Sequence, residues 1–125
     1  MIVGVGIDTV CISELEGMCD DGGAFESYMF SEGERRYASH RLRPCESLAG
    51  MLAVKEAVTK AVCTLDPDRW IDMRLIEVEH DVHGAPHVSM KDPLAGYLEG
   101  VSVSSVLVSI TNEGDFATAI ALAQS

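Results

Sequence analysis

Apolar residues alternate with glycines at the start of the chain, where Val3, Val5 and Ile7 are separated by Gly4 and Gly6. Alternation with a period of two is typical of a β-strand. We therefore predict a first strand that ends at the first charged residue of the chain, the aspartate at position 8.

Helical spacing follows this strand. Ile12, Leu15 and Cys19 are spaced as the inner stripe of a short helix around 11–19, which the Asp-Asp-Gly-Gly segment ends. Further on, Ser31 and Glu34 have the spacing of a capping box, in which each side chain satisfies a free backbone amide at a helix start. This pair predicts a second helix over about 32–40.

The segment from Ser47 to Val62 is the most strongly helical of the chain, because it is rich in Ala and Leu and carries an apolar face. Glu56 and Lys60 lie four residues apart within it and share a helix face. Their spacing is also that of an ordinary exposed ion pair, so spacing alone assigns them no function.

Beyond Pro67 the pattern changes to that of strands. The segments with strand-like alternation or β-branched residues are 73–79, 86–90, 101–111 and 116–122, with turns at 81–85 and 112–115 and a short helix near 92–99. Both faces of the last two strands are apolar, so we expect them to be buried on both sides. Helices that precede a mostly antiparallel sheet indicate an α+β fold.

Size and composition describe one globular domain over residues 1–125. The chain has 125 residues, of which 47% are hydrophobic and 23% are charged. No apolar run has the length of about 20 residues that a membrane span requires, and the apolar start has no basic lead, so we expect neither a membrane segment nor a signal peptide. The four cysteines include no Cys-x-x-Cys pair, and we interpret them as reduced thiols of a cytoplasmic protein.

The net charge of −11 argues against nucleic-acid binding, which depends on Lys and Arg to neutralise phosphates. Basic residues are absent from the first 34 positions, and six of the nine occur in the next 26. This cluster is either a solvated helix face or a local anion site on an acidic protein. Its members are Arg35, Arg36, Arg41, Arg43, Lys55 and Lys60.

Asp8 and Glu56 are the residues that most suggest chemistry. A carboxylate at the end of an apolar strand needs a partner, either as a helix cap or as part of a site. Two carboxylates from separate elements suit Mg²⁺, which keeps several waters and completes its coordination with substrate phosphates. Lys60 would meet the same phosphates as a point charge.

Several motifs together resemble a known family. They are Gly6-Ile7-Asp8-Thr9-Val10, Phe30-Ser31-x-x-Glu34, Leu48-Ala49-Gly50-x-x-Ala53-Val54-Lys55-Glu56-Ala57-x-x-Lys60-Ala61, Trp70-Ile71-Asp72, Gly84-x-Pro86 and Val108-Ser109-Ile110-Thr111. In this order, over essentially the whole chain, they resemble the holo-acyl-carrier-protein synthases, which are small 4′-phosphopantetheinyl transferases.

The resemblance implies a 4′-phosphopantetheinyl transferase-like fold and a definite reaction. Such enzymes transfer 4′-phosphopantetheine from coenzyme A to a serine of an apo acyl carrier protein and release adenosine 3′,5′-bisphosphate. They are usually trimers with coenzyme A in a cleft between subunits. By this resemblance Asp8 and Glu56 hold Mg²⁺, Glu56 and Lys60 are catalytic, and Lys55, Lys60, Ser109, Thr111 and Asn112 bind substrate.

The chain departs from the family pattern at three places. Met51 stands where members commonly have Arg, and Asn112 where they often have His, both near the nucleotide end of coenzyme A. The first helix carries Glu14 and Glu16 instead of the basic residues that grip an acidic carrier. We therefore expect the carrier to dock on Arg35, Arg36, Arg41 and Arg43. The alternative is an impaired relative that only binds coenzyme A or a carrier protein.

Overall fold

The computed structural model describes all 125 residues as helices on one side of an antiparallel sheet. The helices are α1 (Ile12–Met18), α2 (Ala24–Met29), α3 (Glu32–Ser39), α4 (Pro44–Cys63), the short 3₁₀ helix η1 (Met73–Leu75) and α5 (Leu94–Gly100). The strands are β1 (Ile2–Cys11), β2 (Val78–His80), β3 (Pro86–Val88), β4 (Ser105–Glu113) and β5 (Phe116–Gln124). The α+β prediction is confirmed.

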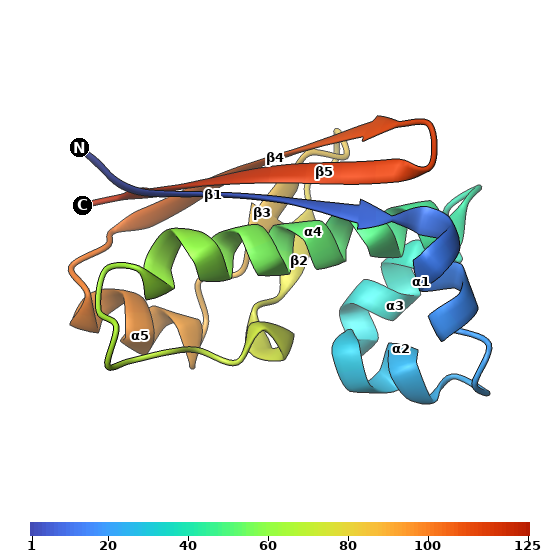
Figure 1. The fold of residues 1–125 in the computed structure, drawn as a ribbon, viewed down its shortest axis with the longest axis horizontal. Coiled ribbons are helices and arrows are strands. Elements are labelled where there is room, and N and C mark those ends of the chain that lie inside the picture. The colour runs from blue at the N-terminus through green and yellow to red at the C-terminus, as the bar shows by residue number, and fades with distance from the viewer.

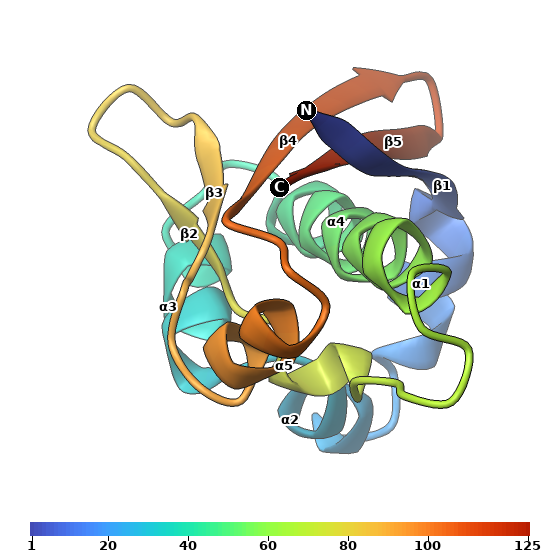
Figure 2. The ribbon, with the colours of Figure 1, turned by 90° about the vertical axis from the view of Figure 1, so that its left-hand side faces the viewer.

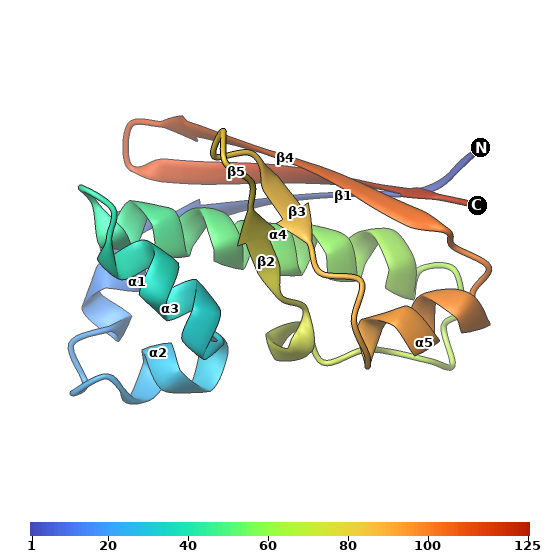
Figure 3. The same ribbon diagram turned by 180° about the vertical axis from the view of Figure 1, so that it is seen from behind.

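Helix α4 is the centre of the fold. Figure 2 shows it nearly end-on, with the three-stranded sheet over one side and the other helices on the opposite side. The strand order in this sheet is β1-β5-β4, and all neighbours are antiparallel. The hairpin of β2 and β3 forms a separate two-stranded sheet beside α3 and α4 (Figure 3). None of the helices combines the length and apolar character needed to cross a bilayer.

Small residues bring the sheet close to α4. Four alanines of β5, at positions 117, 119, 121 and 123, are fully buried on the face toward the helix. A Cβ atom at Gly4 or Gly6 would collide with the carbonyl oxygens of Ala61 and Ala57 on α4. The glycines are therefore required by close packing of β1 on the helix, and this packing sets the position of the next inward residue, Asp8.

The outer face of the sheet is exposed, which corrects the expectation that the last strands are buried on both sides. Several of its side chains are apolar nevertheless: Val5, Ile7 and Leu107 are 60%, 59% and 54% exposed. A single chain has one helical layer, and α4 covers only the face of the sheet that carries the alanines. The apolar pattern of this face therefore does not reflect burial within one chain.

Other predicted elements differ in detail. The capping box of Ser31 and Glu34 is confirmed at the start of α3. The predicted strand over 73–79 is wrong in its first half, where Asp72 caps a 3₁₀ turn and only Val78–His80 pairs with β3. Helix α2 was not predicted, because it has six residues and its start depends on Asp21, which accepts from the amide of Phe25.

Candidate functional site

The packing of β1 on α4 brings together three residues that the sequence analysis selected. Lys60 Nζ lies 2.7 Å from Asp8 Oδ1 and also donates to the carbonyl of Ile7 at 3.1 Å. Glu56 lies one turn before Lys60 on α4, near enough to Asp8 that, besides burial, the charge of Asp8 raises the pKa of the Glu56 carboxyl group. Asp8 comes from β1, whereas Glu56 and Lys60 come from successive turns of α4, so the cluster exists only in the folded chain.

The two carboxyl groups have opposite pKa shifts. Burial, followed by the hydrogen bond and the charge of Asp8, raises the pKa of Glu56 from 4.5 to about 7. Burial would also raise the pKa of Asp8, but hydrogen bonds with Glu56 and Lys60 and the Lys60 charge hold it below its usual value. The hydrogen bond and charge of Asp8 raise the pKa of Lys60. Glu56 is therefore the carboxyl group of the pair that keeps its proton to higher pH, beside an exposed ammonium group.

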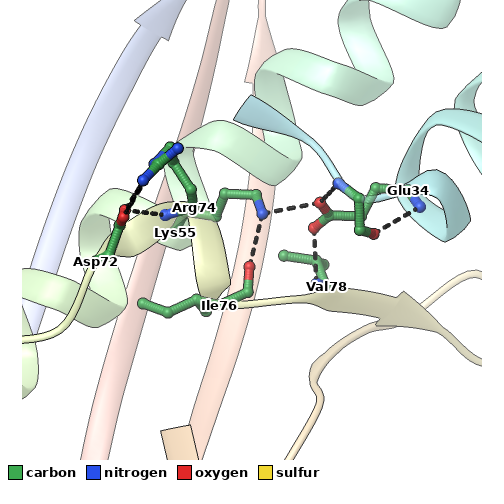
Figure 4. Close-up of polar contacts among 7 residues, drawn as sticks. Glu34, Lys55, Asp72, Arg74, Ile76 and Val78 are labelled. Carbon is green, nitrogen blue, oxygen red and sulfur yellow. Dashed lines mark hydrogen bonds and ion pairs between the residues drawn. The ribbon is translucent and has the colours of Figure 1, made fainter. Parts of the chain in front are cut away.

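Lys55 corrects the expectation that it binds substrate. Its side chain is fully buried and forms an ion pair with the equally buried Glu34, at 2.8 Å from Nζ to Oε1 (Figure 4). Lys55 also donates to the carbonyl of Ile76 at 2.6 Å. Burial lowers the pKa of Lys55, and the charge of Glu34 opposes that shift. With no exposed surface, this ammonium group has a structural role.

The second acceptor atom of Glu34 extends this network. Glu34 Oε2 accepts from the amide of Val78 at 2.8 Å, and Oε1 accepts from the amide of Ser31 at 2.8 Å (Figure 4). One carboxylate thus joins α3, α4 and β2. The Ser-x-x-Glu spacing identified the cap, but nothing in the sequence pairs residue 34 with residue 55.

A pocket of about 420 Å³ opens at the first turn of α4. Its lining residues are Tyr37, Arg41, Leu42, Arg43, Glu46, Ser47, Gly50, His80, Gly84, Pro86, Ile110 and Asn112. Of the residues predicted to act at a site, it contains Arg41, Arg43 and Asn112. The Tyr37 and His80 rings stack with centroids 3.9 Å apart, and sequence analysis selected neither residue.

The predicted set of four arginines is divided by the structure. Arg35 and Arg36 lie on α3, and Arg36 forms an exposed ion pair with Glu32. Arg41 and Arg43 lie in the segment between α3 and α4 and line the pocket instead. Two of the four arginines therefore lie on a helix and two at the pocket.

Ser109 and Thr111 lie apart from Asp8 within one chain. Residues paired across neighbouring strands share a face, and Asp8 pairs with Ala119, which points at α4. Ser109 pairs with Ile120, on the outer face of the sheet, and Thr111 shares that face. Met51 is fully buried and has no polar group to offer a ligand.

Comparison with known proteins assigns the family. The model of the 4′-phosphopantetheinyl transferase superfamily matches residues 4–121. The chain belongs to this superfamily. The holo-[acyl-carrier-protein] synthase of Mycobacterium tuberculosis is 38% identical over 133 residues, covering 99% of this chain and 98% of that relative. The protein is accordingly an enzyme of the phosphopantetheinyl transferase class, whose family reaction moves phosphopantetheine from coenzyme A to an apo carrier protein.

Solved structures agree with this assignment. The synthase of Neisseria meningitidis superimposes with a TM-score of 0.86 at 28% identity and full coverage of both chains. A synthase from Chronobacterium ammoniagenes, described as a complex with coenzyme A, superimposes with a TM-score of 0.80 at 33% identity. The match covers 97% of this chain and 96% of that one. The predicted phosphopantetheinyl transferase-like fold is thereby confirmed.

Proposed function

We propose that this enzyme transfers 4′-phosphopantetheine from coenzyme A to a serine of an apo acyl carrier protein, with Mg²⁺ as cofactor, and releases adenosine 3′,5′-bisphosphate. The observation that carries the proposal is the cluster of Asp8, Glu56 and Lys60. Asp8 approaches two residues that lie 48 and 52 positions later in the chain, and a phosphate-bearing substrate would find metal ligands and a cation there.

The residues present fit a magnesium ion. Two neighbouring carboxyl groups repel each other when both are ionised, and the raised pKa of Glu56 reflects that repulsion in part. A divalent cation held by Asp8 and Glu56 would remove this repulsion. When bound, it would neutralise charge on the pyrophosphate of coenzyme A.

The chain's own residues supply the remaining chemistry. Lys60 is exposed enough to contact the substrate phosphates while it stays charged through Asp8. In the reaction the serine oxygen forms a bond to the phosphorus that carries pantetheine, and the bond to the adenosine bisphosphate breaks. The serine proton needs an acceptor within hydrogen-bond reach, and the Glu56 carboxylate or a water beside it would take the proton.

We also propose that the protein is a homotrimer whose subunits pack through the outer face of the sheet. The register places apolar residues side by side: Val5, Leu122 and Leu107 form one row, and Ile7 and Ile120 the next. A second copy of the chain offers the same apolar face, which supports self-association. In such an assembly Ser109 and Thr111 of one subunit could reach the carboxylate cluster of another, as the family's intersubunit cleft implies.

The substrate contacts divide between two parts of the chain. We assign the pyrophosphate to the cluster of Asp8, Glu56 and Lys60, and the nucleotide to the pocket that contains Asn112. Support for the second assignment comes from Arg41 and Arg43, the two cations at the pocket, and from the stacked ring of Tyr37. We place the reaction in the cytoplasm, where the four unpaired cysteines would remain reduced.

The decisive experiment is to incubate protein, Mg²⁺, coenzyme A and apo carrier protein, and to weigh the carrier by mass spectrometry. We expect a gain of one phosphopantetheine group. Asp8→Ala and Glu56→Ala should each abolish the gain while the far-ultraviolet circular dichroism stays unchanged. Glu99→Ala, on exposed α5, is the matched control and should remain active. No gain with any of several carriers would favour the alternative of a coenzyme A-binding protein.

A further inference from the structure

The pocket at the start of α4 contains a carboxylate among its cations. Glu46 uses both of its oxygens there: Oε2 lies 2.8 Å from Arg43 Nη1, and Oε1 accepts from Asn112 Nδ2 at 3.1 Å. The Glu46 side chain is 24% exposed and that of Arg43 is 68% exposed, so the acid is the better-buried partner. Two groups that would otherwise donate to an incoming anion are thus already engaged.

We infer that Glu46 is a specificity-determining residue that weakens recognition of the 3′-phosphate of coenzyme A by occupying Arg43 and Asn112. The inference rests on the proposed function, because it takes the nucleotide of coenzyme A as the ligand of this pocket. Carboxylate and phosphate oxygens bind the same guanidinium and amide donors. A 3′-phosphate must therefore displace Glu46 or bind without these donors.

The charges around the pocket support the inference. Arg43 and Glu46 neutralise each other, which leaves Arg41 as the uncompensated cation. The Arg41 guanidinium lies 5.4 Å from the centre of the Tyr37 ring and makes no ion pair. Burial, followed by the Arg41 charge, lowers the pKa of His80, so this imidazole adds no positive charge at neutral pH. A doubly charged phosphate thus meets one free cation and one carboxylate.

The size of the effect follows from Coulomb's law. A unit charge about 6 Å from a phosphate dianion changes its binding constant about tenfold, even at the dielectric constant of water. Removing the Glu46 charge should therefore improve binding of a nucleotide with a 3′-phosphate about tenfold. It should leave a nucleotide without that phosphate nearly unaffected.

The test measures the dissociation constants of adenosine 3′,5′-bisphosphate and adenosine 5′-monophosphate by isothermal titration calorimetry. The ratio compared is the dissociation constant of the monophosphate divided by that of the bisphosphate. Glu46→Gln keeps the side-chain size and should raise this ratio about tenfold. Arg43→Gln should lower the ratio in the wild-type background, because it leaves the Glu46 charge uncompensated, and should cancel the gain in the Glu46→Gln background. Glu99→Gln removes the same charge at the opposite end of the molecule and should leave the ratio unchanged.

Three outcomes would overturn the inference. An unchanged or lower ratio in Glu46→Gln would mean that Glu46 does not compete with the phosphate. An equal rise in Glu99→Gln would mean that net charge alone is responsible. Failure of both nucleotides to bind would mean that the pocket is not their site.

The carrier assay separates this inference from the proposed function. Coenzyme A and 3′-dephospho-coenzyme A are compared as donors for the wild type and Glu46→Gln. If the wild type modifies no carrier with either donor although the calorimetric ratio shifts as expected, the proposed function fails and the inference stands. If the carrier is modified and the ratio does not move, the inference alone fails.

Discussion

The buried pair of Glu34 and Lys55 allows a stringent test of how the fold supports the site. Both side chains are fully buried, and their charged atoms lie 2.8 Å apart. Lys55→Met would leave the Glu34 carboxylate with only the amides of Ser31 and Val78 as donors. Glu34→Gln would deprive the Lys55 ammonium of its carboxylate partner and leave it with neutral acceptors, the carbonyl of Ile76 and the introduced amide oxygen.

Removing one partner of a buried ion pair typically costs about 3–5 kcal/mol, because the other charge stays in a medium of low dielectric constant. A domain of this size has a free energy of unfolding of about 5–15 kcal/mol, so each single variant loses a large part of it. The double variant Glu34→Gln/Lys55→Met buries no charge. It should be more stable than either single variant, which requires a coupling free energy larger than the greater single loss, about 3 kcal/mol or more.

The pH dependence gives Glu34→Gln a signature of its own. Burial already lowers the pKa of Lys55, and loss of the opposing Glu34 charge lowers this pKa further. Below the ordinary pKa of lysine the folded state of this variant then binds fewer protons than the unfolded state, so stability is gained as the pH rises. The double variant has no ammonium group at this position and should lack this gain.

The assay is urea denaturation followed by circular dichroism at several pH values. Glu32→Gln is the control, because its ion pair with Arg36 is exposed and should contribute less than about 1 kcal/mol. The reasoning would be refuted if either buried variant lost less than about 1 kcal/mol, or if the two losses simply added in the double variant.

Three further predictions concern titration, assembly and carrier docking. In Mg²⁺-free buffer the free energy of unfolding should fall as the pH rises from 4.5 toward 7, because the folded protein keeps the Glu56 proton until about 7. Glu56→Gln should remove this part of the slope in pH-dependent denaturation, and equal slopes would contradict the assignment. Ile7→Glu, on the exposed outer face, should yield monomers by light scattering. Leu75→Glu, comparably exposed on η1, is the control and should remain a trimer. A trimer in both variants would rule out this interface. The rate of phosphopantetheine transfer at sub-saturating carrier should rise and then fall as the salt concentration increases. Arg36→Glu should raise the KM for the carrier without changing the KM for coenzyme A. A rate that only falls with salt, together with an unchanged KM for the carrier, would mean that the carrier docks at another surface.

Local signals in the sequence determined much of the architecture. The alternation before Asp8, the Ser-x-x-Glu box before α3 and the Ala-rich segment of α4 each depend on interactions within a few residues, and each appears in the structure. The pattern was least informative where one cap or one turn decides the outcome. At 73–75 the alternation suggests a strand, but the Asp72 cap favours a 3₁₀ turn.

The local sequence pattern does not predict the distances between helices and strands. Residue type and position suggested Asp8, Glu56 and Lys60, and a family resemblance supported the choice. Their approach depends on how closely β1 packs on α4, which Gly4 and Gly6 permit. The same holds for Lys55. It adjoins Glu56 in the chain, yet successive helix residues point about 100° apart, so one side chain enters the core and its neighbour faces β1.

The tertiary structure also decided what two sequence patterns meant. Apolar residues on both faces of β4 and β5 predicted double burial, but only packing shows that one face stays exposed in a single chain. The cluster of basic residues looked like one surface, whereas the chain turns between α3 and α4 and carries Arg41 and Arg43 into a pocket beside Glu46 and Asn112. Residue types and their order thus determined the elements and the family, and the packing of those elements determined which charges meet, because an ion pair depends on distance in space and not on separation along the chain.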